Sequence, residues 1–262
     1  DLDALADVKL TVGAVVRPGG ALVLNADDPT LRAKATGLGR RFGRCPPIAW
    51  FAVDADDPFL VAHRAAGGAT CGIRDGHLRL SASGADHDLG ALVTLPLTLE
   101  GRAAYNVANL AAAALAAVAM GIPPATVASV FAGFGSRVED NPGRLMRFDA
   151  SGVRVLVDYA HNPEGMRGFL QVAESLRNGA GRLGVLLGHA GNREDRDVER
   201  LAEVAAEFRP ALVVVKELEG YLRGRQPGEV PGLIRAALLR AGLPESAVRL
   251  RPNEIDAVLC AL

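Results

Sequence analysis

The stretch Val153-Arg-Val-Leu-Val-Asp-Tyr-Ala-His-Asn-Pro-Glu-Gly-Met-Arg167 decides the fold of the second half of this chain. Its first five residues form a short apolar run rich in β-branched side chains, which predicts a buried strand. Asn162 and Pro163 are typical of a helix start, because asparagine caps free backbone N–H groups and proline suits the first helical position. The stretch is therefore a strand that leads directly into a helix.

Asp158 and His161 lie between that strand and that helix. In a parallel α/β sheet, the carboxyl ends of the strands open onto the ligand crevice, so an acid and an imidazole placed there can contact a ligand. The alternative is that the two residues only cap a turn. This stretch alone favours neither interpretation.

The chain around this stretch alternates strands with helices. Further strands are expected at 183–187, 211–215 and 247–250, and helices at 163–177, up to about 208, and at 227–241. Such alternation predicts a doubly wound α/β domain with right-handed crossovers. Polar residues follow three consecutive strands, so we expect them along one edge of the sheet. No GxGxxG is present, so a dinucleotide fingerprint is absent.

The first part of the chain predicts a second domain. We expect a helix over 2–16 in which Lys9 lies in an apolar stripe. Either Lys9 extends its ammonium to water, or it is a partly buried amine with a lowered pKa that can be modified; periodicity alone favours the first. A strand at 21–24 leads into a helix at 29–35, capped by Asp28.

Strands joined by turns are expected between 48 and 99, at 49–53, 60–64, 69–73, 77–82 and 92–99. Asp75-Gly76 is the clearest hairpin turn. Two helices follow, at 105–120 and 125–131. The polar segment 133–142 then marks a domain boundary, so the predicted domains are 1–140 and 141–262.

Two further positions are candidate ligand contacts. Asn106 and Asn109 are three residues apart on one helix face, and two amides there can read the edges of a purine; capping is the alternative. Arg144 follows the boundary, where an arginine can close onto a phosphate or can be an ordinary surface charge.

Composition limits the classes of function. The 262 residues have a net charge of −1, so no overall basic field attracts nucleic acid. Hydrophobic residues make up 49%, yet no apolar run is long enough to span a membrane. Three scattered cysteines indicate reduced thiols of a cytoplasmic protein. Both ends look cut, so we expect a fragment of a longer protein.

Four motifs, in this order, resemble the Mur ligase family. They are Leu-Asn-Ala-Asp-Asp-Pro ending at Pro29, Gly-Arg-x-x-Tyr-Asn-Val-Ala-Asn ending at Asn109, Asn-Pro-Gly-Arg-Leu ending at Leu145, and Val-Asp-Tyr-Ala-His-Asn-Pro ending at Pro163. The later loops most resemble those of the cyanophycin synthetase branch. The resemblance implies the C-terminal part of a P-loop-type central ATPase domain, followed by a Rossmann-like C-terminal domain. It also implies a ligase that forms amide bonds with ATP and Mg²⁺ through an acyl phosphate.

The resemblance assigns roles to individual residues. Lys9 matches a lysine that is carbamylated and helps to hold magnesium. Asn106 and Asn109 match contacts to adenine, and Asp158 matches a contact to ribose. Arg144 matches an arginine that reaches the phosphates, with His161 beside it. The residues expected to meet the incoming amino acid are Asn192, Arg193, Lys216, Arg223 and Arg225.

The resemblance also leaves alternatives open. The family's phosphate loop, GxxGKT, does not occur in this sequence, so we expect the chain to be inactive alone. In a cyanophycin-like enzyme the acceptor is an aspartyl carboxylate of a peptide or polymer and the amine is an amino acid such as arginine. A peptidoglycan-type Mur ligase and a non-catalytic module that binds a nucleotide or partner are the alternatives, and a homo-oligomer remains open.

Overall fold

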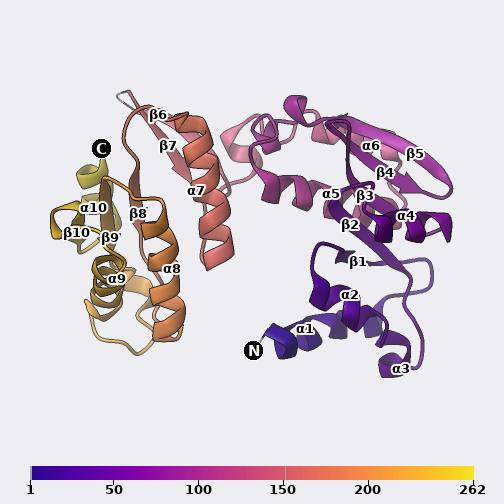
Figure 1. Ribbon diagram of the computed structural model, residues 1–262, viewed down its shortest axis with the longest axis horizontal. Helices are drawn as coiled ribbons and strands as arrows, with labels where there is room; N and C mark the ends of the chain where they lie inside the picture. The colour runs from indigo at the N-terminus through magenta and orange to yellow at the C-terminus, as the bar shows by residue number, and fades with distance from the viewer. Residues whose placement is uncertain (1, 151) are drawn as a thin grey trace. The chain divides into compact units, whose positions relative to one another are not determined.

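The computed structural model describes residues 2–150 and 152–262, and it divides into two units, 1–140 and 141–262 (Figure 1). This division falls at the boundary that the sequence predicts. Each unit contains its own sheet and its own apolar core, so the architecture is α/β, as predicted.

The first unit is built on a five-stranded sheet in the order β1-β2-β3-β4-β5. Strands β1 (Leu22–Asn25), β2 (Ile48–Asp54) and β3 (Thr70–Arg74) are parallel, whereas β4 (His77–Ala82) and β5 (Ala85–Ala91) are antiparallel. The expected hairpin turn at Asp75-Gly76 joins β3 to β4. Both of its residues have positive φ, at 52° and 74°, which is the conformation that such two-residue turns require.

Helices cover both faces of this sheet. Along β2, Ala49 and Phe51 face one core, while Trp50 and Ala52 face the other, because successive side chains of a strand alternate. Helix α5 (Ala104–Ala119) and α6 (Pro124–Phe131) pack on the first face. The second face is covered by α1 (Leu2–Leu10), α2 (Pro29–Ala35), α3 (Leu38–Phe42) and α4 (Pro58–Ala65).

Two of the expected strands in this unit are wrong. The segment expected as a strand at 60–64 lies in α4, because Asp57 caps the N–H of Phe59 and Pro58 occupies the first turn. The same signal at Asp28-Pro29 correctly predicts α2. The segment expected as a strand at 92–99 forms two short 3-10 turns, Leu92–Thr94 and Pro96–Thr98. A further 3-10 turn, Val138–Asp140, lies at the end of the unit.

The helix expected over 2–16 is shorter than predicted. Its α-helical part ends at Leu10, and a 3-10 segment, Thr11–Val15, follows. Leu10 and Gly13 face the core, and Gly13 packs closely against the ring of Phe42. Lys9 is exposed, which agrees with the interpretation that its ammonium extends to water and not with the alternative of a partly buried amine. Its apolar neighbours on the helix, Leu5, Val8 and Val12, are exposed as well.

The second unit contains a three-stranded parallel sheet in the order β10-β9-β8. Its strands are β8 (Gly184–Leu187), β9 (Leu212–Lys216) and β10 (Val248–Arg251), close to the expected positions. Helices α7 (Pro163–Arg177), α8 (Asp195–Glu207) and α9 (Glu229–Arg240) share one core with Val213 and Val215. Helix α10 (Glu254–Ala261) packs on β9. The 3-10 turns Glu219–Tyr221 and Glu245–Ala247 precede α9 and β10.

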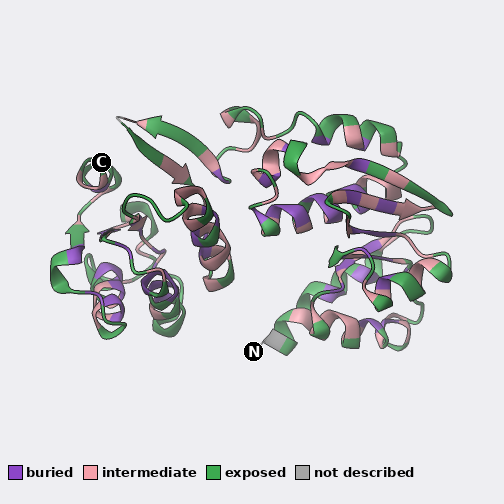
Figure 2. Ribbon diagram, turned by 45° about the horizontal axis from the view of Figure 1, so that its top comes forward, coloured by how far each residue is buried: buried purple, intermediate pink, exposed green. Residues whose placement is uncertain are grey.

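The strand expected from the decisive stretch forms, but it lies outside this sheet. Within the described residues, β7 (Val153–Val157) pairs antiparallel with β6 (Met146–Ala150) alone. Val153 and Val157 are 40% and 41% exposed, and Figure 2 shows no buried residue along either strand. The predictions of a buried strand and of three strand ends on one sheet edge are therefore wrong. An apolar run fixes strand formation, but it does not fix the pairing partner.

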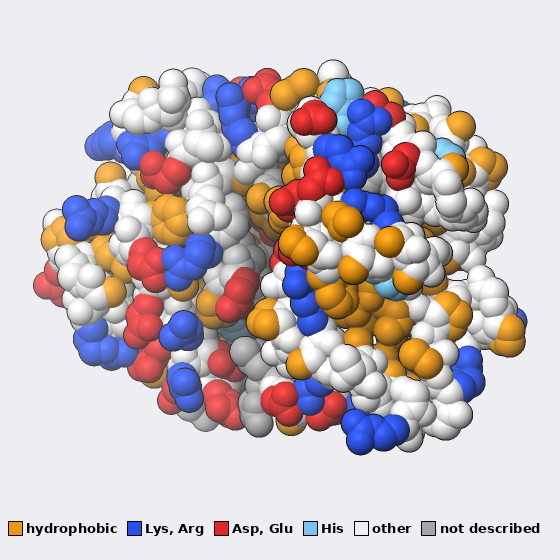
Figure 3. Space-filling model, turned by 45° about the vertical axis from the view of Figure 1, so that its right-hand side comes forward, with side chains coloured by type: hydrophobic (Ala, Val, Ile, Leu, Met, Phe, Trp, Pro, Cys, Tyr) orange, Lys and Arg blue, Asp and Glu red, His pale blue; other side chains and the backbone are white. Residues whose placement is uncertain are grey.

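Two further features concern the helices and the surface of the chain. No helix among the described residues is long and apolar enough to cross a membrane. Positive and negative side chains are interspersed on the face in Figure 3, as a net charge of −1 suggests.

Candidate functional site

Asp158 fixes the end of β7 in the second unit. Its Oδ2 accepts the backbone N–H of Leu145 at 2.8 Å, and its Oδ1 accepts that of Ala160 at 2.9 Å. Leu145 and Ala160 have positive φ, at 48° and 25°, a region that L-residues adopt at a cost. The carboxylate thus stabilises two strained backbone positions on either side of the site.

Three side chains stack beside this carboxylate. The guanidinium of Arg144 lies over the ring of Tyr159, 5.1 Å from its centre. The Tyr159 ring in turn contacts the imidazole of His161, with 4.6 Å between ring centres. Cation–π contact orients an arginine without using its N–H donors, so Arg144, which is exposed, keeps its donors available for a ligand.

His161 lies in a positive environment. Its pKa is lowered from the ordinary 6.5, first by partial burial and then by the charges of Arg193, Arg144 and His189, while Asp158 acts in the opposite direction. The guanidinium groups of Arg193 and Arg144 therefore act on one imidazole at the start of α7, where Asn162 caps the N–H of Gly165 at 2.7 Å. Free N–H groups and the helix dipole add positive potential there. This cluster favours an anionic ligand.

His189 joins the loop after β8 to this cluster. It is buried, with 7% of its surface exposed, and its Nε2 lies 3.1 Å from the carbonyl oxygen of His161. Its Nδ1 lies 3.2 Å from the carbonyl oxygen of Ala190. A neutral imidazole donates to only one of two such acceptors, and the tautomer with the proton on Nε2 is the one that bonds the loop after β8 to the His161 segment.

Tyr159 and His189 are the site residues that the sequence analysis missed. A usable signal existed for both, because His189 follows a buried strand and Tyr159 stands between Asp158 and His161. Strand ends of α/β folds are where such residues serve ligands.

The residues predicted to contact the incoming amino acid differ in their exposure and in their partners within the protein. Asn192 and Arg193 are exposed on the loop after β8 and can meet a ligand. Lys216 instead pairs with Glu254 of α10 and has only 15% of its side chain exposed. Arg223 is exposed, and its guanidinium lies 5.3 Å from the centre of the Tyr221 ring.

Arg225 is committed to the protein itself. Its donors bond the carbonyl oxygens of Gly191 and Arg193 at 3.0 and 2.7 Å, and the carboxylates of Asp195 and Glu229 at 2.7 and 2.6 Å. Protein acceptors thus hold both Arg225 and Lys216 in this structure, and a direct contact of either residue with a substrate stays a prediction.

In the first unit, the two predicted purine-reading amides share a helix face, as expected. Asn109 Nδ2 donates to Asn106 Oδ1 at 3.3 Å. Asn106 is 5% exposed, however, and its own Nδ2 donates to the carbonyl oxygen of Leu97 at 2.9 Å. Asn106 is therefore buried and bonded within the protein, whereas Asn109 is exposed, and the contact of the two amides with adenine stays a prediction.

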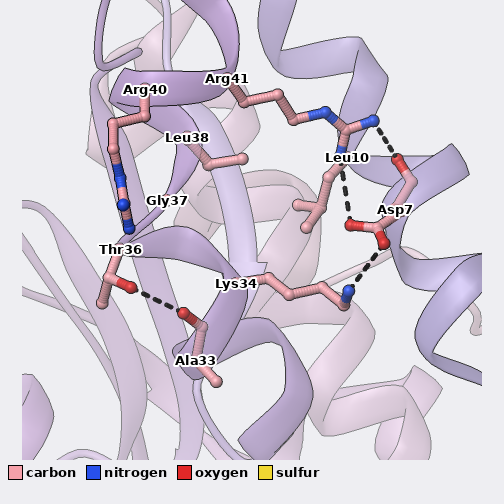
Figure 4. A pocket seen from close by; sticks show the side chains of 9 residues that line it. All are labelled: Asp7, Leu10, Ala33, Lys34, Thr36, Gly37, Leu38, Arg40 and Arg41. Atoms are coloured by element: carbon pink, nitrogen blue, oxygen red, sulfur yellow. Dashed lines mark hydrogen bonds and ion pairs between the residues drawn. The ribbon is translucent and has the colours of Figure 1, made fainter.

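The exposure of Lys9 follows from how α1 is held. Asp7 pairs with Lys34 at 2.8 Å and with Arg41 at 3.2 Å, at a shallow pocket of about 290 Å³ between α1, α2 and α3 (Figure 4). Lys9 is two positions further along, which rotates its side chain about 200° away from Asp7. Among residues 2–150 and 152–262, no three His, Cys, Asp or Glu side chains converge to hold a metal.

The class of protein follows from these features. The second unit is a parallel α/β domain whose cationic side chains gather at a strand end and a helix N-terminus, as in proteins that bind phosphates. Residues 143–258 match the Mur ligase, glutamate ligase domain. The whole chain is 30% identical to the cyanophycin synthetase of Synechocystis sp. over 261 residues, which is 100% of this chain and 28% of that protein.

A second relative adds a further ligase to the comparison. The UDP-N-acetylmuramate–L-alanine ligase of Kineococcus radiotolerans is 32% identical over 250 residues, covering 92% of this chain and 46% of that enzyme. The chain therefore belongs to the Mur ligase family, and it spans less than half the length of either relative.

Solved structures show the same fold. A UDP-N-acetylmuramoylalanyl-D-glutamyl-2,6-diaminopimelate–D-alanyl-D-alanyl ligase from Acinetobacter baumannii matches with a TM-score of 0.58 at 16% identity, over 98% of this chain and 48% of that one. A folylpolyglutamate synthase from Thermotoga maritima matches with a TM-score of 0.57 at 14% identity, over 94% and 56%.

Proposed function

We propose that the chain is part of an ATP-dependent ligase that forms amide bonds through an acyl phosphate, and that the ligase resembles cyanophycin synthetase. It would join an amino acid such as arginine to an aspartyl carboxylate of a peptide or polymer. The observation that carries the proposal is the cationic cluster around His161, in a chain whose relatives are ligases.

The chain's own residues would bind and orient the nucleotide. ATP supplies the phosphoryl group that activates the carboxylate. Arg144 and His161 would contact its phosphates, with Arg193 adding positive charge from the neighbouring loop. Exposed Asn109 would contact adenine, and Asp158 would contact ribose through lone pairs that its two backbone bonds leave free.

Magnesium does not fit the described residues by themselves. Lys9 is exposed and no acidic or imidazole cluster accompanies it. We therefore derive no step through the metal. The role of a carbamylated Lys9 as a metal ligand stays a proposal that depends on residues outside these 262.

The setting of the reaction is also proposed. The sequence contains no GxxGKT loop, so we expect this polypeptide by itself to form no amide bond. We further propose a cytoplasmic enzyme whose partners are small molecules and a carboxylate polymer, with no nucleic acid or membrane, and whose subunits can form a homo-oligomer.

Binding of ATP to the chain tests whether the cationic cluster around His161 binds phosphates. Isothermal titration with ATP should show binding that Arg144→Ala weakens by about tenfold, since a hydrogen bond to a charged group contributes about 1.5–3 kcal/mol. Arg147→Ala, at an exposed arginine of the same unit, is the matched control. If both variants bind ATP with the affinity of the wild type, Arg144 does not contact the phosphates.

A peptidoglycan-type Mur ligase is the second candidate, favoured by the L-alanine-adding relative at 32% identity. A full-length protein that contains this chain would separate the two. Incubation with ATP and either an aspartyl polymer with arginine or a muramoyl nucleotide with alanine should give product with the first pair. Product with neither pair, despite ATP binding, would indicate a non-catalytic nucleotide-binding module.

A further inference from the structure

The loops that follow β8 and β9 touch along their length. Gly191 N donates to the carbonyl oxygen of Tyr221 at 2.8 Å. A Cβ added at Gly191 would lie 2.0 Å from the carbonyl oxygen of Leu222, so a residue with a side chain does not fit without moving one of the loops. The two loops are therefore packed backbone against backbone.

Arg225 lies at the centre of this contact. Its side chain is 15% exposed, and its guanidinium reaches two carbonyl oxygens of the β8 loop, those of Gly191 and Arg193. It also reaches Asp195, in the first turn of α8, and Glu229, in the first turn of α9. One planar cation thus connects a loop to the starts of two helices, which a lysine with a single ammonium cannot reproduce.

The held loop is the one that carries the exposed Asn192 and Arg193. The same loop contacts the His161 segment through His189, whose Nε2 lies 3.1 Å from the carbonyl oxygen of His161, and the charge of Arg193 acts on the His161 ring. We propose that Arg225 is a positioning residue, which fixes the β8 loop so that Arg193 is presented beside His161 for the anionic ligand. The effect of Arg225 on ligand binding rests on the proposed function. The positioning role is an alternative to the direct substrate contact expected from sequence.

Hydrogen exchange of the 262-residue chain tests the positioning role. In Arg225→Lys, the amides of residues 189–194 should exchange about tenfold faster, the factor that corresponds to about 1.4 kcal/mol. Gly191→Ala should have the same effect, because it separates the loops without touching Arg225. Arg235→Lys is the matched control, since Arg235 lies on the following helix α9 and, within the described residues, pairs only with Glu245.

The variant Glu229→Gln distinguishes loosening of the loop from a general loss of stability. Glu229→Gln removes one ion pair and leaves both carbonyl bonds, so the midpoint of unfolding and the exchange of 189–194 should stay near wild type. Faster exchange throughout the second unit in Arg225→Lys would indicate global destabilisation and would overturn the proposal. Unchanged exchange of 189–194 would overturn it as well.

Two further readouts separate a positioning role from a merely structural one. The NMR titration of His161 should move to higher pH in Arg225→Lys as Arg193 moves away, with Arg144, His189 and Asp158 still facing the ring. The affinity for ATP should fall by about tenfold. A looser loop with unchanged ATP affinity would overturn the ligand-positioning role. If wild type binds no ATP, the proposed function fails, whereas exchange and the His161 titration still decide whether Arg225 fixes the loop.

Discussion

Replacing Asp158 should destabilise the second unit selectively. The carboxylate accepts two backbone N–H groups, at 2.8 and 2.9 Å, from Leu145 and Ala160. A hydrogen bond to a charged group contributes about 1.5–3 kcal/mol. Because both bonds are only partly buried, we take the lower value for each, so Asp158→Ala should lower the free energy of unfolding by about 3 kcal/mol.

Asp158→Asn should cost about half as much, about 1.5 kcal/mol, because the amide keeps one acceptor oxygen and loses the other. Asp149→Ala is the matched control on the same two-stranded ribbon; its carboxylate is exposed, so a change within about 0.5 kcal/mol is expected.

Urea denaturation can show which of the two units loses stability. The single tryptophan, Trp50, lies in the first unit, so its fluorescence transition should not shift. Far-UV circular dichroism and hydrogen exchange of 153–157 should both show the loss. An Asp158→Ala protein within about 0.5 kcal/mol of wild type would refute the view that this carboxylate supports the strained backbone on either side of the site.

Three further predictions follow from the contacts of single residues. Asn106→Ala should destabilise the first unit by about 1–3 kcal/mol, measured by thermal unfolding, because the carbonyl oxygen of Leu97 loses its hydrogen-bond donor. Asn109→Ala should leave stability unchanged and weaken ATP binding, measured by calorimetry. Loss of stability in Asn109→Ala and loss of ATP binding in Asn106→Ala would contradict this prediction. Arg193→Ala should raise the pKa of His161, measured by NMR. The pKa of wild-type His161 lies below 6.5, so the unfolded state binds more protons, and stability rises with pH between the folded value and 6.5; this rise should shrink in the variant, and an identical titration would exclude the coupling. In a full-length ligase that contains this chain, Lys9→Arg should abolish turnover, since a guanidinium cannot be carbamylated, and near-wild-type turnover would leave Lys9 as an ordinary exposed lysine.

Local signals in the sequence predict most of the elements. The Asn162-Pro163 and Asp28-Pro29 pairs place the starts of two helices correctly, because capping is decided by the residues at the helix end itself. The turn at Asp75-Gly76 is correct for the same reason. The strand expected at 60–64 failed although Asp57-Pro58 carries the same capping signal, so that error was avoidable.

Tertiary partners decide what the sequence could not predict. The apolar stripe around Lys9 is present, but the pairing of Asp7 with Lys34 and Arg41 turns the opposite side of α1 to the core. Arg225 has the residue type and the loop position of a substrate contact. Glu229, four residues further on, is the one acceptor near it in sequence. The other three acceptors, at positions 191, 193 and 195, are about thirty residues away, and the sequence does not show that they surround Arg225.

The loop fixed by Arg225 is free to diverge in sequence. Within the loop, Arg225 bonds only carbonyl oxygens, which every residue type carries, so substitutions at Asn192 or Arg193 leave those bonds in place. Three other positions of the loop are restricted: Gly191 by the close approach of Leu222, Gly188 by that of Lys216, and buried His189 by its contact with the carbonyl oxygen of His161. Related enzymes with this arrangement can therefore exchange the side chains offered to an incoming substrate while the backbone path is inherited unchanged, which is how a common scaffold comes to serve different substrates.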